Sequence, residues 1–289
     1  MLHFGRNDPN QQNVEAGHLL NHPVTASCRG SDDRAVLRDV AGYDGGDWAW
    51  EFLRLNKDYV ADWRRSLPRH LPCIRLNDGT QLLRLPRRFP HAEKWGLHAF
   101  ADPALRPDQA PVFWHANALK RAVRVNAKRP SGDEDERVYR LTDFKADRRA
   151  VIGVDGIARV LMKGRGTQVA VEIHGLQVLT APFAPGFELN DLSALGAQTE
   201  LLKRLQRFTE PDIREIQKTA YEERLHHALI ALEESLSGKT YRQIAITIFG
   251  EKKVAEEWQG PSQFLKDRTR RLVAKGTELM KGGYCELLG

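Results

Sequence analysis

The chain has 289 residues, of which 41% are hydrophobic and 28% are charged, and its formal net charge is +6. This balance is that of a folded globular protein, and the mild positive charge is compatible with a polyanionic partner without indicating one. The cysteines, Cys28, Cys73 and Cys285, form no C-x-x-C pair. Their scarcity argues against a disulfide framework and favours a reducing compartment.

The beginning of the chain lacks the pattern of a targeting signal. Residues 1–10 are polar and do not have the basic-then-apolar layout of a signal peptide. No apolar run approaches the roughly 20 residues that a membrane-spanning helix needs. We therefore expect a soluble, cytoplasmic protein with no membrane partner. Residues 1–38 are punctuated by Asn, Asp, Gly and Pro, which predicts a flexible N-terminal tail.

An aromatic motif follows the predicted tail. A helix is expected to begin at Asp47, whose carboxylate can accept hydrogen bonds from the amides of the first turn, and to end near Asn56. A second short helix follows it. The aromatic residues on these helices are Trp48, Trp50, Phe52, Tyr59 and Trp63. Two interpretations stay open: a small core that fixes the helices on the central region, or a subunit interface, where Trp and Tyr are enriched.

The central region, to about residue 185, has the pattern of strands. The dipeptide Asp78-Gly79 lies between apolar runs at 74–76 and 81–85 and predicts a β-hairpin. Apolar runs at 151–154, 158–162 and 169–173 predict an antiparallel meander, and the charged stretch 129–137 predicts an exposed loop. We expect residues 39–185 to form a mixed domain with a β-rich antiparallel centre.

The region after residue 185 is predicted to be helical. One apolar face is formed by Leu195, Leu201, Leu202 and Leu205, and a second runs from 213 to 232 before Gly238 ends the helix. The expected fold class is therefore α+β. It combines a helical N-terminal motif, a β-rich antiparallel centre and an all-α C-terminal domain over residues 186–289.

Residues 240–281 are expected to form a helix-turn-helix unit. Thr240 can cap a helix, and Gln243 stands where it completes a capping box. Gly250 ends that helix, and residues 252–258 could form one or two further turns. Ser262 is expected to cap the last long helix, which runs from Gln263 to about residue 281.

The last helix carries the candidate DNA contacts. Projected at about 100° per residue, it has an apolar stripe for docking and an outward face that holds Gln263 and Arg270. These two side chains have the groups that read adenine and guanine, whereas Arg268, Arg271 and Lys275 are better placed to bind phosphates. The predicted DNA-binding residues are Thr240, Arg242, Gln263, Lys266, Arg268, Arg270, Arg271 and Lys275. Basic residues beside an apolar stripe are also common on any solvated helix, so the charge pattern alone does not establish DNA binding.

These segments resemble a known family of bacterial regulators. The residues that carry the resemblance are 240–245, Phe249, Gly250, Trp258, 265–272 and 282–288 at the C-terminal end, and 43–63, 95–97, Phe100, Asp102, Pro103 and 112–114 in the N-terminal half. The C-terminal set resembles the DNA-binding domain of RovC-like activators, which regulate type VI secretion and integrative conjugative elements. The N-terminal set resembles the transcriptional-regulator-like domain that precedes it in fused forms. The resemblance implies an oligomeric, DNA-binding transcription activator.

Patterns of enzyme and metal chemistry are weak in this sequence. Gly164 and Gly166 lack the third glycine of a dinucleotide-binding fingerprint and are more typical of a hairpin turn. His91, His98 and His115 are scattered, and no Ser/His/Asp or Cys/His arrangement can be identified. We expect no enzyme activity, no catalytic residue, no cofactor and no metal.

The sequence thus predicts a sequence-specific transcriptional activator that binds promoter DNA as an oligomer. The expected targets are genes of a secretion cluster or a mobile element, and the expected partners are double-stranded DNA, further copies of the chain and RNA polymerase. Its expected place is the cytoplasm, associated with the nucleoid. The alternative is an antiactivator that keeps the helical fold but binds a partner regulator.

Overall fold

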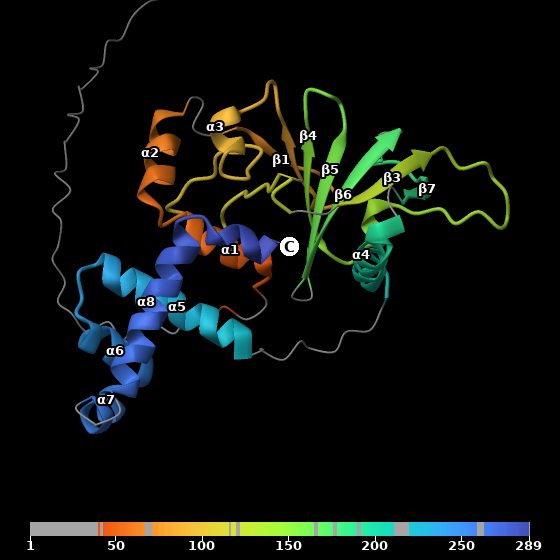
Figure 1. Ribbon diagram of the computed structural model, residues 1–289. Coiled ribbons are helices and arrows are strands. Elements are labelled where there is room, and N and C mark those ends of the chain that lie inside the picture. Colours follow the sequence, from red (N-terminus) through yellow and green to blue (C-terminus); the bar gives the residue numbers. More distant parts are fainter. Residues whose placement is uncertain are drawn as a thin grey trace, which may run out of the picture. The chain divides into compact units, whose positions relative to one another are not determined.

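The computed structural model describes residues 40, 43–66, 71–115, 117–119, 122–164, 167–175, 178–189, 192–210, 220–258 and 263–288. The chain divides into two units, Met1–Arg38 and Asp39–Gly289. The predicted N-terminal tail is the first unit and lies outside the described residues. Within the second unit, helices from the two ends of the chain lie together on one side of a sheet (Figure 1).

Two short helices begin the described fold, α1 (Gly45–Leu53) and α2 (Lys57–Arg65). The Asp47 amide donates to the Asp44 carboxylate at 3.0 Å, and the Asp44 amide donates to the Asp47 carboxylate at 3.1 Å. The prediction that Asp47 is the cap is therefore wrong, because Asp44 is the residue outside the helix and Asp47 is its partner in a capping box. Asn56, where the pattern predicts the first helix to end, instead caps α2 by accepting from the amides of Asp58 and Tyr59.

The described strands form one seven-stranded sheet in the order β1-β2-β4-β5-β6-β3-β7. They are β1 (Cys73–Arg75), β2 (Gln81–Arg84), β3 (Val123–Lys128), β4 (Asp147–Ile152), β5 (Ala158–Gly164), β6 (Thr167–Gly175) and β7 (Ala184–Glu188). The predicted hairpin is confirmed, since β1 and β2 pair antiparallel around Gly79 at a φ of 85°. The predicted meander is confirmed as β4, β5 and β6, which pair antiparallel in succession.

The sheet is mixed, which corrects the prediction of an antiparallel centre. Strand β2 pairs parallel with β4, and β3 pairs parallel with β6. Each of these pairs is joined by a long segment of chain, and a long crossover permits the parallel alignment that a tight turn forbids. Short helical segments α3 (Pro90–Glu93) and η1 (Leu141–Asp143) lie within these crossovers.

The C-terminal part is helical after β7. Its elements are η2 (Leu192–Ala194), α4 (Leu195–Arg207), α5 (Ala220–Leu236), α6 (Tyr241–Phe249), α7 (Glu251–Glu257), α8 (Phe264–Met280) and η3 (Gly283–Leu288). The capping box predicted for α6 is confirmed, because the Gln243 amide donates to the Thr240 hydroxyl and the Gln243 side chain accepts from the Thr240 amide. Gly238, at a φ of 84°, follows the end of α5 as predicted.

The two faces of the sheet belong to different hydrophobic cores. Neighbouring side chains on a strand point to opposite faces. On β5, Val160 and Met162 join a core with Leu205 and Phe208, at the C-terminal end of α4, whereas Leu161 joins the aromatic helices. Helix α4 therefore covers one face and α1 covers the other.

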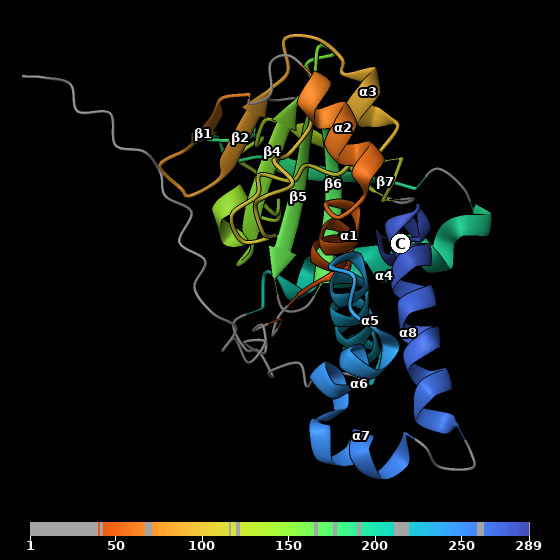
Figure 2. The same cartoon turned by 90° about the vertical axis from the view of Figure 1, so that its left-hand side faces the viewer.

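The helices from the two ends of the chain share the larger core. Trp48 and Trp50 of α1 are buried in one cluster with Leu229 of α5, Leu279 of α8 and Tyr284 of η3. Contacts between α1 and η3 and between α5 and α8 bring these elements together (Figures 1 and 2). The start and the end of the described fold are thus packed against each other.

Candidate nucleic-acid interface

Helices α6, α7 and the start of α8 form a small helical tip (Figure 2). Ala245 of α6, Val254 of α7 and Leu265 of α8 are each almost fully buried in a common cluster. Gly250 alone separates α6 from α7, and its φ of 87° is one that a glycine adopts without strain. One residue therefore turns the chain between two helices that share a core.

Helix α8 is fixed by its inner face. Its buried residues Leu265, Thr269, Val273, Gly276 and Leu279 recur at intervals of three and four and face α5 and α6. The helix backbone approaches α5 closely, since a Cβ on Gly276 would lie 2.6 Å from the carbonyl oxygen of residue 228. The C-terminal end of α8 also packs on α1 and η3. The outer face of its N-terminal half remains open to solvent.

Gln263 does not lie where the helical projection placed it. It precedes α8 with a φ of 45°, the left-handed region, and it is the only described non-glycine residue with a positive φ. Its side chain makes no capping hydrogen bond. The prediction that Gln263 lies on the outward face of the helix is therefore wrong, although the residue is exposed at the helix start. The predicted cap, Ser262, lies outside the described residues.

Two predicted contact residues lie at the start of α6. The Thr240 hydroxyl is engaged with Gln243 in the capping box, so the structure gives Thr240 a role in starting the helix. Arg242 is exposed on the first turn. No ion pair is found for Arg242 among the described residues.

The basic residues of α8 differ in their surroundings. The guanidinium of Arg268 lies 4.7 Å from the centre of the Phe249 ring, and His227 packs on the same ring at 6.0 Å. Burial, with the nearby charge of Arg268 as a further cause, lowers the pKa of His227. Arg268 is thus partly held against the tip by a cation–π contact.

Of the remaining cations of α8, Arg270, Arg271 and Lys275 are exposed, and Lys266 is half-buried. Arg270 lies 3.6 Å from Asp267, and Lys275 lies 3.0 Å from Glu278, with all four side chains between 44% and 54% exposed. Exposed pairs of this kind contribute little, about 0–1 kcal/mol, so a phosphate can replace the carboxylate as partner. Lys266 and Arg271 have no ion pair in the described part of the chain. From 264 to 275 the helix carries five basic residues and one acidic residue.

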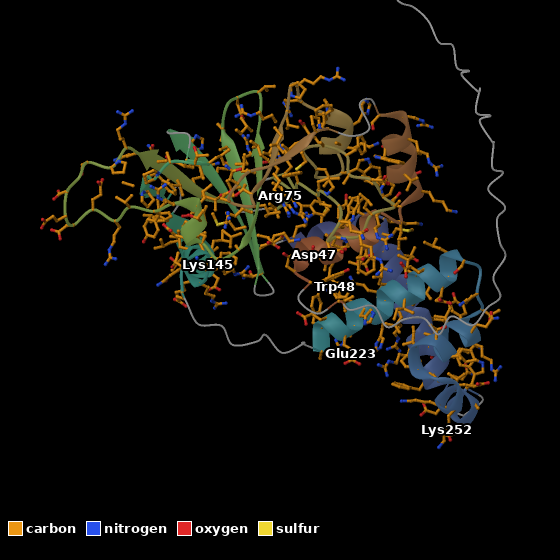
Figure 3. All side chains as sticks on the ribbon, turned by 180° about the vertical axis from the view of Figure 1, so that it is seen from behind. Asp47, Trp48, Arg75, Lys145, Glu223 and Lys252 are labelled. Atoms are coloured by element: carbon orange, nitrogen blue, oxygen red, sulfur yellow. The ribbon has the colours of Figure 1, made fainter. Side chains whose placement is uncertain are left out.

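Helix α7 adds two basic residues that the helical projection of α8 does not include. Lys252 and Lys253 are exposed on the helix that follows the Gly250 turn, and Lys252 lies at the far end of the tip (Figure 3). In the sequence, the pattern that indicates α7 is Gly250 followed by the apolar Val254. However, Glu251, Glu256 and Glu257 are exposed on the same helix, so its net charge does not favour a polyanion.

The aromatic cluster lies inside the fold. Trp48, Trp50, Phe52 and Tyr59 are at most 2% exposed, and Trp63 is half-buried. The Trp50 indole donates to the carbonyl oxygen of residue 105 at 3.0 Å, and the Tyr59 hydroxyl donates to that of residue 101 at 2.7 Å. These surroundings are those that the core interpretation predicts, while a contribution to a subunit interface stays a prediction.

Other arrangements in the described residues carry no comparable chemistry. His98 and His115 pack with ring centres 4.5 Å apart, but no group of three or more His, Cys, Asp or Glu side chains in the described part of the chain is placed to hold a metal. No described helix is both long enough and apolar enough to cross a bilayer.

A helical tip whose exposed helix carries an excess of basic side chains is compatible with DNA binding. Comparison with protein families agrees. Residues 181–289 match the RovC DNA-binding domain, described as the DNA-binding domain of a T6SS transcription factor, and residues 32–98 match the proteobacterial transcriptional regulator-like domain. The two matches confirm the resemblance and indicate a transcription factor with a DNA-binding domain. None of the curated proteins matches the chain.

Proposed function

We propose that this transcription factor is a sequence-specific activator that binds promoter DNA as an oligomer through α6, α7 and α8. The observation that carries the proposal is the solvent-facing side of α8, a helix whose inner face is fixed. Arg270, Arg271 and Lys275 are exposed there, and Lys266 is half-buried beside them. This helix lies inside the segment that matches the DNA-binding family. The chemistry of the face supports a role as a recognition helix.

The roles of individual side chains follow from their positions. Arg270 points outward near the start of α8, where side chains reach base edges, and its guanidinium can donate two hydrogen bonds to guanine. Gln263, exposed just before the helix, can pair with adenine. Lys266, Arg271 and Lys275 would bind phosphates and supply affinity independent of sequence. Arg268 would act partly through its contact with Phe249.

Oligomerisation would supply the remaining specificity. One recognition helix contacts only a short half-site. Symmetric copies of the chain, bound to a repeated operator, together recognise a longer DNA sequence. In this proposal residues 39–185 assemble subunits and contact RNA polymerase, and residues 186–289 form the DNA-binding domain with its helix-turn-helix at 240–281. The protein would act in the cytoplasm, on nucleoid DNA of a secretion or mobile-element gene cluster, without enzymatic activity.

The antiactivator function has one observation in its favour. Tyr241 and Phe264 are aromatic side chains of the helical tip, and they are 43% and 61% exposed. Exposed aromatic residues are common anchors of protein interfaces. A partner regulator could therefore bind at the same end of the molecule, in place of DNA.

The salt dependence of binding separates the two functions. Fluorescence anisotropy would measure the affinity of the full chain for promoter fragments from beside its own gene, over a range of salt concentrations. Each neutralised phosphate makes the slope of log affinity against log salt concentration more negative by about 0.9. We expect a slope of roughly −3 to −5 from the cations of α8. Absence of binding to every fragment, or binding that salt does not weaken, would contradict the DNA-binding proposal.

A further inference from the structure

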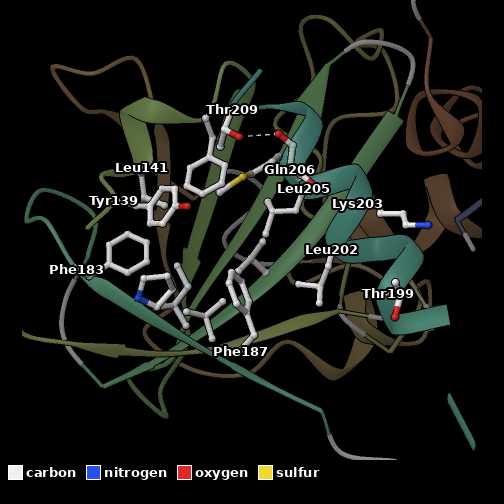
Figure 4. A pocket seen from close by; sticks show the side chains of 16 residues that line it. Tyr139, Leu141, Phe183, Phe187, Thr199, Leu202, Lys203, Leu205, Gln206 and Thr209 are labelled. Atoms are coloured by element: carbon white, nitrogen blue, oxygen red, sulfur yellow. Dashed lines mark hydrogen bonds between the residues drawn. The ribbon is translucent and has the colours of Figure 1, made fainter. Parts of the chain in front are cut away.

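A cavity of about 470 Å³ lies between the sheet and helix α4 (Figure 4). Val125 of β3 and the side chains Val171 and Ile173 of β6 form part of its floor. Leu202 and Leu205 of α4 form one wall. The volume is within the range of small-molecule sites, about 300–1,000 Å³.

Aromatic rings form the wall opposite α4. Tyr139 and Phe183 lie side by side there (Figure 4), because their main chains exchange two hydrogen bonds of 2.9 Å. The Tyr139 ring also stacks on Phe144, with ring centres 5.9 Å apart. Phe187 of β7 closes the lower side in the same view. The wall is therefore built of rings held in place by neighbouring contacts, which suits a flat apolar molecule.

The Tyr139 hydroxyl is a polar group turned into this apolar space. It lies on the side of its ring that faces α4 (Figure 4), and no hydrogen bond to it is found among the described residues. The Thr209 hydroxyl at the edge of the cavity donates to the main-chain oxygen of Gln206 at 2.7 Å. The Lys203 side chain points away from the aromatic wall (Figure 4). No described cation is thus aimed at the centre, and a mainly neutral ligand fits best.

A small molecule fits this space better than a peptide. The floor strand β3 already pairs with β6 on one side and with β7 on the other, so β3 itself has no open edge for an added strand. A peptide entering the cavity would leave its own amides and carbonyls unpaired among apolar side chains, which is costly. An apolar molecule with one hydrogen-bonding group has no such cost.

We propose that this cavity binds a small, mainly aromatic organic molecule through its apolar walls and a hydrogen bond to Tyr139. The site spans two parts of the chain, since β3, β6 and residue 139 precede the segment that matches the DNA-binding domain, whereas Phe183, β7 and α4 belong to it. A bound molecule would contact both parts. The binding itself does not depend on the proposed DNA-binding function.

The test uses N-phenyl-1-naphthylamine, a neutral aromatic probe whose fluorescence rises in an apolar site and whose N–H can donate to the Tyr139 oxygen. Titration of the full chain is expected to give saturable binding at one site per chain. Leu202→Trp fills the cavity from α4 and is expected to weaken binding at least tenfold. Leu195→Trp is the matched control, because Leu195 is on the same helix, is 40% exposed and does not line the cavity.

A second variant keeps the result interpretable if Leu202→Trp does not fold. Tyr139→Phe retains the ring and removes the hydroxyl, and we expect the probe to bind about 3- to 10-fold more weakly, as for the loss of one hydrogen bond. Tyr221→Phe, at an exposed position of α5, is its control and should leave binding unchanged. The proposal is overturned if the folded chain shows no saturable binding, as when its own residues fill the cavity. It is also overturned if Tyr139→Phe binds the probe like the unmodified chain.

Discussion

The side-chain amide of Asn56 donates a hydrogen bond of 2.9 Å to the main-chain oxygen of Met280, across 224 positions of sequence. The same Asn56 side chain caps α2 through its oxygen. Met280 is the last residue of α8. One buried side chain therefore starts a helix in the N-terminal half and also fixes the end of the helix proposed to contact DNA.

Replacing Asn56 separates these two roles. Asn56→Ser keeps a capping oxygen but cannot reach the carbonyl of Met280, so we expect a loss of about 1 kcal/mol in the free energy of unfolding. Asn56→Ala removes both interactions, and the loss of the cap adds about 1 kcal/mol. Urea unfolding followed by circular dichroism measures both. Equal stability of the two variants would contradict the double role.

Because α5 and α8 are in close contact at Gly276, adding a single methyl group there is expected to lower the stability of the fold. In Gly276→Ala the new Cβ would lie 2.6 Å from the main-chain oxygen of Ala228 and 2.9 Å from the Cβ of Leu232. The helices must then move apart, at a cost of about 1–3 kcal/mol. Thermal unfolding should show a lower midpoint for this variant.

Gly196→Ala is the control for that substitution. Gly196 also lies in a helix, α4, and a Cβ there meets nothing within 4 Å among the described residues. Its stability should be unchanged or higher by up to about 1 kcal/mol, because alanine restricts the unfolded chain. A drop in Gly196→Ala as large as that of Gly276→Ala would show that the effect is not one of packing between α5 and α8.

These contacts also show what the sequence can and cannot predict. Local signals were sufficient for the Thr240 capping box, the Asp78-Gly79 turn and the meander, because each depends on residues close together in the chain. The parallel pairing of β3 with β6 and the Asn56–Met280 bond join distant segments, and nothing in the local pattern specifies them. In the candidate site, the helical period predicted part of the docking stripe of α8: Leu265, Gly276 and Leu279 are buried, but so are Thr269 and Val273, which were not predicted.

The errors have physical reasons as well. Asp44 and Asp47 are both carboxylates three positions apart, so the sequence is equally compatible with either as the cap, and the structure assigns the role to Asp44. Gln263 adopts a left-handed backbone that a projection of continuous helix cannot represent. Tyr139 and Phe183 lie in irregular segments whose approach depends on the whole sheet, so the cavity carried no sequence signal.

The burial of His98 predicts a dependence of stability on pH. Burial, with the neighbouring His115 as the next cause, lowers the pKa of His98 to about 3. The unfolded side chain takes up a proton near pH 6.5, whereas the folded one stays neutral. The free energy of unfolding therefore contains the full contribution of neutral His98 above about pH 6.5. This contribution is lost progressively as the pH falls toward 3, by about 2 kcal/mol at pH 5.

A variant that lacks the titrating side chain of His98 isolates its effect on the pH dependence of stability. In His98→Gln the difference in unfolding free energy between pH 7 and pH 5 should shrink by about 2 kcal/mol relative to the unmodified chain. Chemical denaturation at the two pH values measures it. The matched control is His91→Gln, at an exposed position, which should retain the pH dependence of the parent. An unchanged pH dependence in His98→Gln would mean that His98 titrates normally in the folded protein.

The different roles proposed for Arg270 and Lys275 of α8 predict different effects on DNA binding when each is replaced. Arg270→Ala should cost about 1–3 kcal/mol on the preferred operator and relax specificity at one base position, because a base contact is lost. Lys275→Ala should weaken binding to all sequences alike and make the salt dependence shallower, because a phosphate contact is lost. Anisotropy titrations on the operator and on single-base variants measure both.

The control for these variants is Arg84→Ala, which removes the same charge from an exposed position on β2, away from the helical tip. It should change the affinity little, since exposed charges beyond about 10 Å are largely screened at moderate salt. If Arg84→Ala weakens binding as much as Lys275→Ala, net charge rather than the face of α8 governs affinity. If Arg270→Ala and Lys275→Ala reduce binding equally on every DNA, Arg270 contacts phosphate, and base reading must be assigned to other residues of the tip, such as Gln263.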